Sequence, residues 1–474
     1  MRILPVDPIA NASHEALANF LLECRGIAER AERPQLVSIS VAVDSLDPLA
    51  VLESIFEPGE LHFYVEKPSE QLAVAGAEAV LSFRASGPGR FAACQAFIDE
   101  TLAHALAVGA VDGAFGGPQF FTAFTFLDQP GVDEPFPAVQ VFVPRWQVGC
   151  RDGATVATAN LLVGPGDDVR PLVERVWRAH AKFRVFDYEH AEFPADAVAP
   201  VRRVEEVGGA GRYREAVASA LGRIGSGVVE KIVLARAQDL HGEGLFHPLR
   251  ALNGLRERFR ECYAFSVGNG AGASFIGASP ERLLRVRAGR LTTEALAGST
   301  RRGATASEDA ALGNALLRDD KELREHRVVA DSIFRRLAPL GLQLEAPARP
   351  VLRRLANVQH LHTPIEAALP PGVRLLDALA RLHPTPAVGG SPREAAVPLI
   401  AGLEGFPRGL YAGALGWIDA RGDGEFFVGL RSALIAGKVT RLYAGAGIVA
   451  GSDPEREYAE TELKIRAMRD ALGA

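Results

Sequence analysis

Lysine and cysteine are scarce in this 474-residue chain, and long apolar runs are missing from it. Only six lysines occur, so arginine is the ordinary basic residue and each lysine is a conspicuous position. The four cysteines are scattered, without a CxxC motif or a nearby histidine, which favours reduced thiols over a zinc site or a disulfide. No stretch approaches the roughly 18 apolar residues of a membrane span, and the N-terminus lacks the apolar segment of a signal peptide. We therefore expect a cytoplasmic protein without membrane association.

The overall balance of charge is mildly acidic, with a formal net charge of -6 and a pI of about 6.1. This balance offers no broad basic surface for nucleic acid, so we expect no nucleic-acid partner. It does not exclude a small anionic substrate, because the local field decides such binding. With 48% hydrophobic and 23% charged residues, the composition is that of a globular protein with a large core.

The first 200 residues alternate strand-like and helical segments. Aromatic and β-branched residues predict strands at 61–65, 120–126 and 138–143, the last ending at Pro144, and apolar spacing predicts helices at 95–108 and 170–182. A short stretch of proline and small residues, 194–200, is interpreted as a lobe boundary. We expect an N-terminal lobe, 1–200, and a catalytic region, 201–474, within one structural domain.

The pattern from residue 210 onward is sharper. It predicts helices at 212–223, 319–337 and 454–472, and strands at 228–237, 264–276, 283–291, 410–418, 425–435 and 439–449. Hairpin-like strands mixed with helices indicate an α+β fold with largely antiparallel sheets. The absence of regular strand–helix alternation disfavours a TIM barrel.

Two residues in this region suggest acid–base chemistry. Lys231 shares its predicted strand face with Val229, Val233 and other apolar residues. Burial there would favour the neutral amine, which can act as a base, although a lysine that extends to solvent from a strand edge would look the same. Glu281 follows a Ser-Pro turn between two strands, where a carboxylate is either functional or simply solvated.

Carboxylates on two predicted helices suggest a metal site. Glu325 lies in a charged helical segment, and Glu457, Glu460 and Lys464 share one face of the last helix. Each pattern alone is typical of a solvent-facing ion-pair surface. Mg²⁺, however, prefers carboxylate oxygens, and the two helices would form such a site if they met, which the spacing does not show.

A glycine-containing segment, 444–449, precedes the last helix. A lone GxG without the strand–loop–helix pattern and a downstream acid does not support a dinucleotide site. Backbone N–H groups at a glycine turn could bind a carboxylate instead. Arg431 could make a bidentate contact with a carboxylate or be an ordinary surface arginine.

Taken in order, several short blocks resemble the chorismate-utilising enzymes, which include anthranilate, aminodeoxychorismate, isochorismate and salicylate synthases. The blocks are EKIVLAR (230–236), GASPERL (277–283), AGS (297–299), EH (325–326), HL (360–361), HPTPAVGG (383–390), LYAGAG (442–447) and residues 457–464. The resemblance covers about residues 210–472, and the first 200 residues match only loosely.

The resemblance implies a fold, a substrate and a set of roles. The fold is two packed, largely antiparallel β-sheets with helices on the outer faces, and the substrate is chorismate, bound with Mg²⁺. Glu325 and Glu460 would be direct metal ligands, Glu457 a water-mediated ligand, and Glu281 the general acid. The substrate site would contain Ala297, Gly298, Ser299, His360, Ala387, Arg431, Tyr443, Gly445, Ala446, Gly447 and Lys464.

Three positions separate the branches of the family. Lys231 stands where aminating anthranilate synthases have glutamine, and Ala297 stands where aminodeoxychorismate synthases have a lysine nucleophile. Ala387 stands where aminating and salicylate-forming relatives more often have threonine or serine. The resemblance therefore favours an isochorismate synthase without a glutaminase partner, in which water activated by Lys231 attacks C2 and the C4 hydroxyl leaves. Menaquinone or siderophore biosynthesis would use the product. A salicylate synthase, an aminating enzyme and a non-catalytic chorismate-binding subunit remain alternatives.

Overall fold

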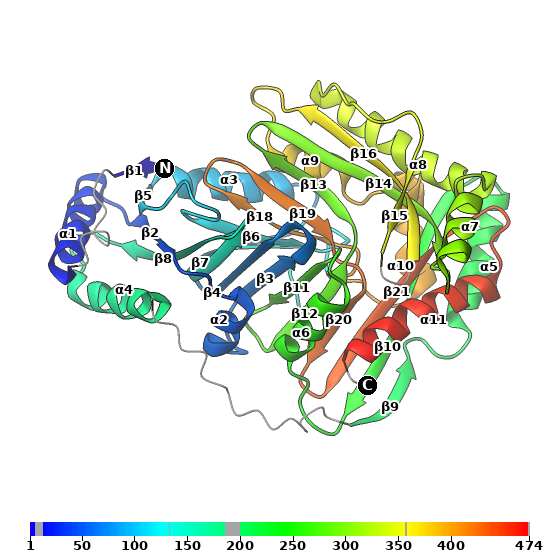
Figure 1. Cartoon of the computed structure of the whole chain (residues 1–474), viewed down its shortest axis with the longest axis horizontal. Coiled ribbons are helices and arrows are strands. Elements are labelled where there is room, and N and C mark those ends of the chain that lie inside the picture. Colours follow the sequence, from blue (N-terminus) through cyan, green and yellow to red (C-terminus); the bar gives the residue numbers. More distant parts are fainter. Residues whose placement is uncertain (5–12, 132, 185–199, 356–357, 473–474) are drawn as a thin grey trace.

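The computed structural model describes residues 1–4, 13–131, 133–184, 200–355 and 358–472 (Figure 1). Its helices are α1 (His14–Ala31), α2 (Pro48–Ile55), α3 (Arg90–Ala103), α4 (Val169–Arg184), α5 (Arg212–Gly225), α6 (Pro248–Arg258), α7 (Ala306–Leu316), α8 (Asp320–Leu337), α9 (Leu375–Leu382), α10 (Arg393–Glu404) and α11 (Pro454–Ala471), with short 3-10 turns at Pro68–Glu70 and Ala338–Leu340. None of the helices in the described ranges is long and apolar enough to cross a membrane.

The strands form one hydrogen-bonded network in which most neighbours are antiparallel. In chain order they are β1 (Arg2–Ile3), β2 (Gln35–Val43), β3 (His62–Lys67), β4 (Leu72–Ala85), β5 (Ala105–Gly109), β6 (Gln119–Phe124), β7 (Val139–Arg151), β8 (Ala154–Val163), β9 (Val201–Glu206), β10 (Lys231–Gly242), β11 (Tyr263–Gly268), β12 (Ala273–Ser279), β13 (Arg282–Arg287), β14 (Arg290–Arg301), β15 (Val351–Arg354), β16 (Val358–Ala368), β17 (Gly390–Ser391), β18 (Ala414–Asp419), β19 (Gly424–Val428), β20 (Ser432–Ala436) and β21 (Val439–Val449). Two pairs, β1–β5 and β2–β5, are parallel. The predicted α+β class with largely antiparallel strands is confirmed.

Strands from the two ends of the chain pair with one another. β3 lies beside β11, and β6 lies beside β18. Aromatic side chains from both parts fill one core, where Phe63 stacks on Phe121 with ring centroids 4.7 Å apart and Phe124 packs near Phe426. Burial of aromatic surface is the main favourable term in such a core, so the first 200 residues stabilise the part that carries the predicted site.

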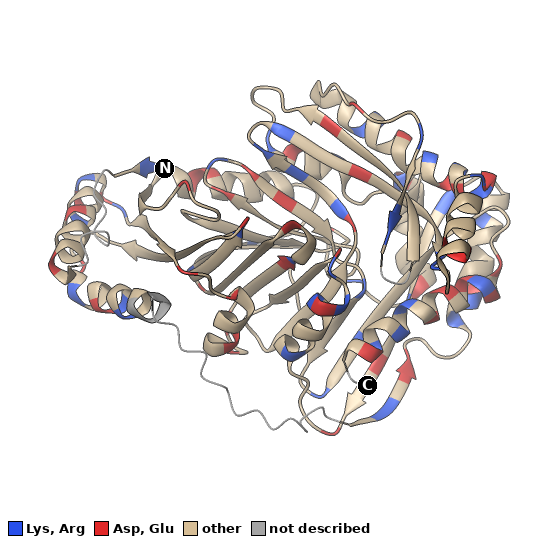
Figure 2. Cartoon of the chain, in the orientation of Figure 1, with Lys and Arg blue, Asp and Glu red and all other residues tan. Residues whose placement is uncertain are grey.

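Charged residues are concentrated on the helices that cover the network, whereas most strand positions are uncharged (Figure 2). α8 begins after Asp319, whose side chain accepts hydrogen bonds from the N–H groups of Lys321 and Glu322. α11 begins with Pro454 after the cap Asp453. These caps satisfy N–H groups that a helix leaves free at its start. α8 packs on β14 and α11 on β21, which brings their predicted site residues to the same region.

Several predicted boundaries were wrong. β7 continues through Pro144 to Arg151. Pro144 lies opposite Ala79 of β4, where the register between the two strands shifts. At such an irregularity the strand does not need the N–H group that proline lacks. The predicted strand 425–435 is two strands, β19 and β20, separated at Arg431, which has a φ of 45°. The predicted helix 95–108 ends at Ala103 and β5 follows it. Most of the predicted lobe boundary, 194–200, lies outside the described residues.

Candidate active site

Every predicted site residue except Glu457 lines one cavity of about 140 Å³. The cavity lies where β10, β14, β16 and β21 meet α8, α11 and the connection between β12 and β13. Its lining combines cations, carboxylates, backbone and apolar groups: Lys231, Glu281, Ala297, Gly298, Ser299, Glu325, His360, Ala387, Arg431, Tyr443, Gly445, Ala446, Gly447, Glu460 and Lys464.

Lys231 is the first residue of β10 and is almost fully buried. In the register it stands between Ser391 of β17 and Val449 of β21. Its Nζ lies 2.7 Å from Oε1 of Glu325, and the two side chains are 2% and 15% exposed. The predicted burial of this lysine on an apolar strand face is confirmed, and the alternative of a solvent-exposed lysine was wrong. α8 adds a carboxylate that β10 alone does not reveal.

Glu281 is buried beside this pair, between β12 and β13. It is 7% exposed, and its backbone carbonyl accepts a hydrogen bond from the N–H of Val428. Burial, followed by the negative charge of Glu294, raises the pKa of Glu281 to about 8, against the opposing charges of Lys231 and Arg353. A carboxyl group in this state is protonated at neutral pH and can donate a proton.

Glu294 is the carboxylate that remains ionised next to this acid. Although burial opposes ionisation, the hydrogen bond from His362 and the charge of Arg353 hold the pKa of Glu294 at about 2. His362 lies 3.0 Å and Arg353 2.7 Å from its oxygens. The N–H of Arg282 also donates to Glu294, at 3.0 Å. Glu294 thus fixes the backbone next to Glu281 and keeps a negative charge near it.

A β-bulge in β14 directs Ser299 toward the cavity. The register with β16 shifts between Leu296 and Ser299, and Gly298 there has a φ of 80°, a conformation that favours glycine. The Oγ of Ser299 lies 2.7 Å from Nδ1 of His360. Burial, followed by nearby cations, lowers the pKa of His360 to about 3, so its ring is neutral at physiological pH. Among the described residues, Nε2 of His360 is buried without a hydrogen-bond partner, and a ligand could supply one.

The segment Gly445, Ala446 and Gly447 lies inside β21, which confirms the predicted strand 439–449, and it does not form a glycine turn. β21 continues to Val449 and pairs with β10 throughout this segment, whereas its pairing with β20 stops at Tyr443. The other edge of β21 is therefore open to the cavity beyond Tyr443. Backbone groups on that edge can bind a substrate oxygen, as the predicted turn was expected to do.

Both glycines make room for neighbouring side chains. A Cβ atom on Gly447 would lie 2.8 Å from Cε of Lys231 and 2.9 Å from Oε1 of Glu325. The carbonyl oxygen of Gly445 accepts a hydrogen bond of 2.8 Å from Nζ of Lys464. The backbone of β21 thus sets the position of both lysines in the cavity.

Arg431 extends from the break between β19 and β20 into the cavity. The left-handed backbone at this residue lets its carbonyl accept a hydrogen bond from the N–H of Ala278. Its guanidinium contacts Sγ of Cys262 at 3.8 Å and pairs with no carboxylate in the part of the chain that the structure describes. Burial lowers the pKa of Arg431. A half-buried guanidinium without a carboxylate partner is suited to an anionic ligand, so the interpretation as an ordinary surface arginine was wrong.

The three carboxylates predicted to hold a metal lie near one another but do not form a ready-made site. Oε1 of Glu460 lies 2.8 Å from Nζ of Lys464, and Oε1 of Glu325 lies 2.7 Å from Nζ of Lys231. Burial and then the charges of Glu460 and Glu325 raise the pKa of Glu457, against a hydrogen bond from Ser452. No three histidine, cysteine or carboxylate groups in the described ranges already surround a metal position. Hard oxygen donors beside a cavity still fit Mg²⁺ chemically, provided that Glu325 and Glu460 exchange lysine contacts for metal contacts.

A buried ion pair that the sequence did not suggest holds the cavity wall together. Glu404 and Arg408 are 1% and 3% exposed. Arg408 donates to the carbonyls of Val388 and Val233, each at 2.8 Å, and Glu404 accepts from the N–H of Ala235 at 2.6 Å. The pair therefore connects β10 to the segment that contains Ala387.

Tyr411 is a second lining residue that was missed. Its ring stacks on that of Tyr443, with centroids 5.2 Å apart and an interplanar angle of 10°. Both Tyr411 and Arg408 lie in 405–413, a Gly- and Pro-containing loop between α10 and β18. Functional residues are concentrated on such loops, so this composition was the signal that could have indicated them.

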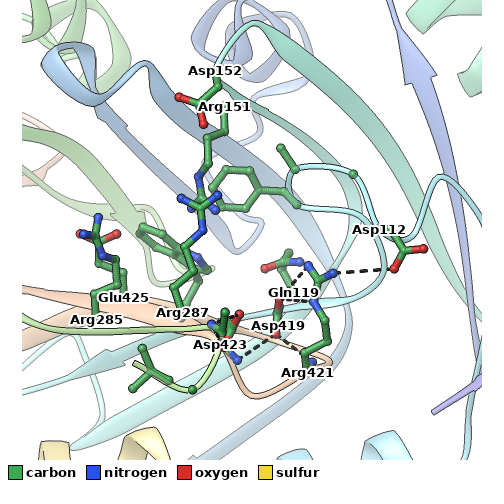
Figure 3. Close-up of a pocket in the computed structure, with 18 residues that line it drawn as sticks. Asp112, Gln119, Arg151, Asp152, Arg285, Arg287, Asp419, Arg421, Asp423 and Glu425 are labelled. Carbon is green, nitrogen blue, oxygen red and sulfur yellow. Dashed lines mark hydrogen bonds and ion pairs between the residues drawn. The ribbon is translucent and has the colours of Figure 1, made fainter. Parts of the chain in front are cut away.

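A larger cavity, of about 550 Å³, shares no lining residue with the one around Lys231. Figure 3 shows Arg421 there between Asp419 and Asp112, at 3.2 and 3.8 Å, and the guanidinium groups of Arg151 and Arg287 close to each other. Its walls contain both signs of charge and none of the predicted site residues. Size alone therefore does not identify the active site.

The sequence of residues 19–473 matches the family described as chorismate binding enzyme. The chain belongs to that family. It is 37% identical, over 98% of its length and 96% of the relative, to the salicylate biosynthesis isochorismate synthase of Pseudomonas aeruginosa. It is 33% identical, over 94% and 95%, to the isochorismate synthase MenF of Bacillus subtilis.

Among solved structures, the chain is similar to the menaquinone-specific isochorismate synthase MenF of Escherichia coli. The TM-score is 0.77, with 28% identity over 95% of this chain and 99% of the other. The predicted membership and the predicted fold of a chorismate-utilising enzyme are confirmed.

Proposed function

We propose that this chorismate-binding enzyme is an isochorismate synthase, an isomerase that converts chorismate to isochorismate. Both relatives reported above that match nearly the whole chain carry that name, as does the enzyme of the similar solved structure. The observation on which the proposal depends is the placement of a lysine amine and a protonated glutamic acid, Lys231 and Glu281, in one buried cavity.

The two groups suit a displacement in which one proton is removed and another is supplied. Lys231 takes a proton from a water whose oxygen bonds to C2 of chorismate. The ring double bonds shift, the C4–O bond breaks, and Glu281 gives its proton to the departing hydroxyl, which leaves as water. One water enters and one leaves, so the reaction is an isomerisation. General acid and general base catalysis each contribute typically 10²–10⁴-fold.

The cations of the cavity suit the two carboxylates of chorismate. Arg431 lines the cavity without a carboxylate partner among the described residues, and Lys464 lines the same cavity. The open edge of β21 adds backbone donors.

We further propose that Mg²⁺ assists the reaction, held by Glu325 and Glu460, with Glu457 acting through a water. When bound, the ion would offset the charge of the ring carboxylate and hold the substrate. The first two carboxylates pair with Lys231 and Lys464, contacts that they would exchange for contacts with the ion. The protein groups then orient the substrate and move the protons.

A salicylate synthase is the nearest alternative, because it would use the same acid and metal carboxylates and would also eliminate pyruvate. Ala387 places a methyl group, and not a hydroxyl, at the cavity wall, which favours isochorismate as the end product. An aminating enzyme is disfavoured by Lys231 and by Ala297. A non-catalytic binding subunit is disfavoured because base, acid and carboxylates share one cavity.

The test is the identity of the product from chorismate. Purified protein is incubated with chorismate and Mg²⁺, and the products are separated by chromatography while pyruvate is measured enzymatically. Isochorismate without pyruvate is expected. Salicylate with equimolar pyruvate would establish the alternative, and no turnover under any condition would support a binding subunit. Whether menaquinone or a siderophore receives the product requires a genetic test, since both routes begin with isochorismate.

A further inference from the structure

A separate cavity of about 400 Å³ has four arginines among its nine lining residues. α8 contributes Arg335 and Arg336, the end of α9 contributes Arg381, and the start of α10 contributes Arg393. Two glutamates, Glu230 and Glu394, also line it. The cavity has no lining residue in common with the candidate active site, so the two cavities are separate sites.

The two less exposed guanidinium groups bind neutral acceptors. Arg336 donates to Oγ of Ser332 at 3.0 Å and to the carbonyl of Arg381 at 3.4 Å. Arg393 donates to the carbonyls of Arg381 and His383, at 3.3 and 2.8 Å. These carbonyls are at the C-terminal end of α9, where a helix leaves acceptors unsatisfied. These hydrogen bonds fix the positions of the guanidinium groups, but the accepting hydroxyl and carbonyl oxygens carry only a partial negative charge.

The nearby carboxylates balance this charge only in part, because four arginines and two glutamates line the cavity. Glu394 is 75% exposed and forms long ion pairs of 4.0 Å with Arg336 and 3.6 Å with Arg393. Glu230 is exposed and accepts only a 3.4 Å hydrogen bond from Ser391. Burial, followed by the charge of Arg393, lowers the pKa of Arg336 to about 10, as expected for like charges held together.

We propose that this arginine pocket binds a phosphate group, either free or as part of a phosphorylated metabolite. Arginines from three elements line it, and the guanidinium groups of Arg336 and Arg393 both reach the carbonyl of Arg381. Their planar forks match the oxygens of a phosphate. An anion there would offset the repulsion between Arg336 and Arg393. A volume of about 400 Å³ also leaves room for an organic group attached to the phosphate. The proposal does not depend on the reaction catalysed at Lys231.

Calorimetric titration of the full-length protein with inorganic phosphate tests the proposal, with sodium chloride at matched ionic strength as the reference. The wild type should bind one phosphate saturably. Arg336→Gln should weaken binding about tenfold, because it removes a charge-assisted hydrogen bond. Arg327→Gln, at an exposed position of the same helix outside the cavity, should leave the affinity unchanged.

A second variant separates binding from helix capping. Arg335 is exposed, lines the cavity and makes no hydrogen bond or ion pair with the described residues. Arg335→Gln should therefore weaken phosphate binding several-fold while the melting temperature stays unchanged. If the wild type shows no saturable binding, or if both cavity variants bind as the wild type does, the proposal is wrong. Loss of binding in Arg431→Gln alone would also overturn it, because the phosphate would then occupy the active-site cavity.

Discussion

Replacing Glu281 by glutamine should stabilise the folded protein at pH 7 while abolishing turnover. Burial, followed by the charge of Glu294, raises the pKa of Glu281 from 4.5 to about 8 in the folded protein. Between these two values the folded protein keeps a proton that the unfolded chain releases. The free energy of unfolding therefore falls as the pH rises through this window. Glutamine keeps the volume and the neutral state but has no proton to lose, so the variant avoids this loss.

The magnitude follows from the width of the window. Each pH unit between 4.5 and 8 lowers the free energy of unfolding of the wild type by about 1.4 kcal/mol. By pH 7 the wild type has therefore lost about 3 kcal/mol of stability. At pH 4.5 the loss is nearly absent. The stability of Glu281→Gln relative to the wild type should thus be about 3 kcal/mol greater at pH 7 than at pH 4.5.

Urea denaturation at the two pH values, followed by tryptophan fluorescence and circular dichroism, measures this difference. Glu57→Gln, at an exposed glutamate, serves as the matched control and should change the free energy of unfolding little at either pH. A relative stability of Glu281→Gln that is the same at both pH values would refute the reasoning. Turnover by this variant at the wild-type rate would separately remove Glu281 from the role of the acid.

Four further changes test the site. Lys231→Ala should abolish turnover while calorimetry still detects chorismate binding; near-normal turnover would contradict its role as the base. Glu325→Gln should shift the Mg²⁺ titration of activity to higher concentrations, and an unchanged titration would argue against a metal ligand. Gly447→Ala should lower kcat roughly a hundredfold by displacing the lysine, whereas Gly402→Ala, where a Cβ meets nothing within 4 Å, should leave kcat unchanged. Glu404→Ala should cost about 3–5 kcal/mol in urea denaturation, because a buried guanidinium loses its partner; a cost below about 1 kcal/mol would exclude a role for the pair in holding the wall.

Local signals predicted the elements that carry the site. The caps Asp319 and Asp453 set the starts of α8 and α11 by hydrogen bonds within one turn, so the sequence alone located both helices. Breaks inside strands were harder to predict. The conformation of Arg431 depends on its close contact with Gly277 and Ala278, which are far away in the sequence.

The composition of the site was predictable, but the contacts within it were not. Short blocks in one order indicated the residues that line the cavity. That Lys231 faces Glu325 depends on the packing of α8 over β14, which no spacing along the chain reports. Arg408 and Tyr411 were missed because no motif marks them, and Tyr411 was included in the predicted strand 410–418, which begins only at Ala414.

The pairing of β3 with β11 and of β6 with β18 has a consequence for protein engineering. A fragment that begins at β9 would expose two bare strand edges and half of an aromatic interior, so it should precipitate when expressed alone. The same pairing should let two separately encoded pieces, divided between α4 and β9, reassemble into one working enzyme. Such a pair of fragments could serve as a split reporter, in which formation of the reaction product measures reassembly.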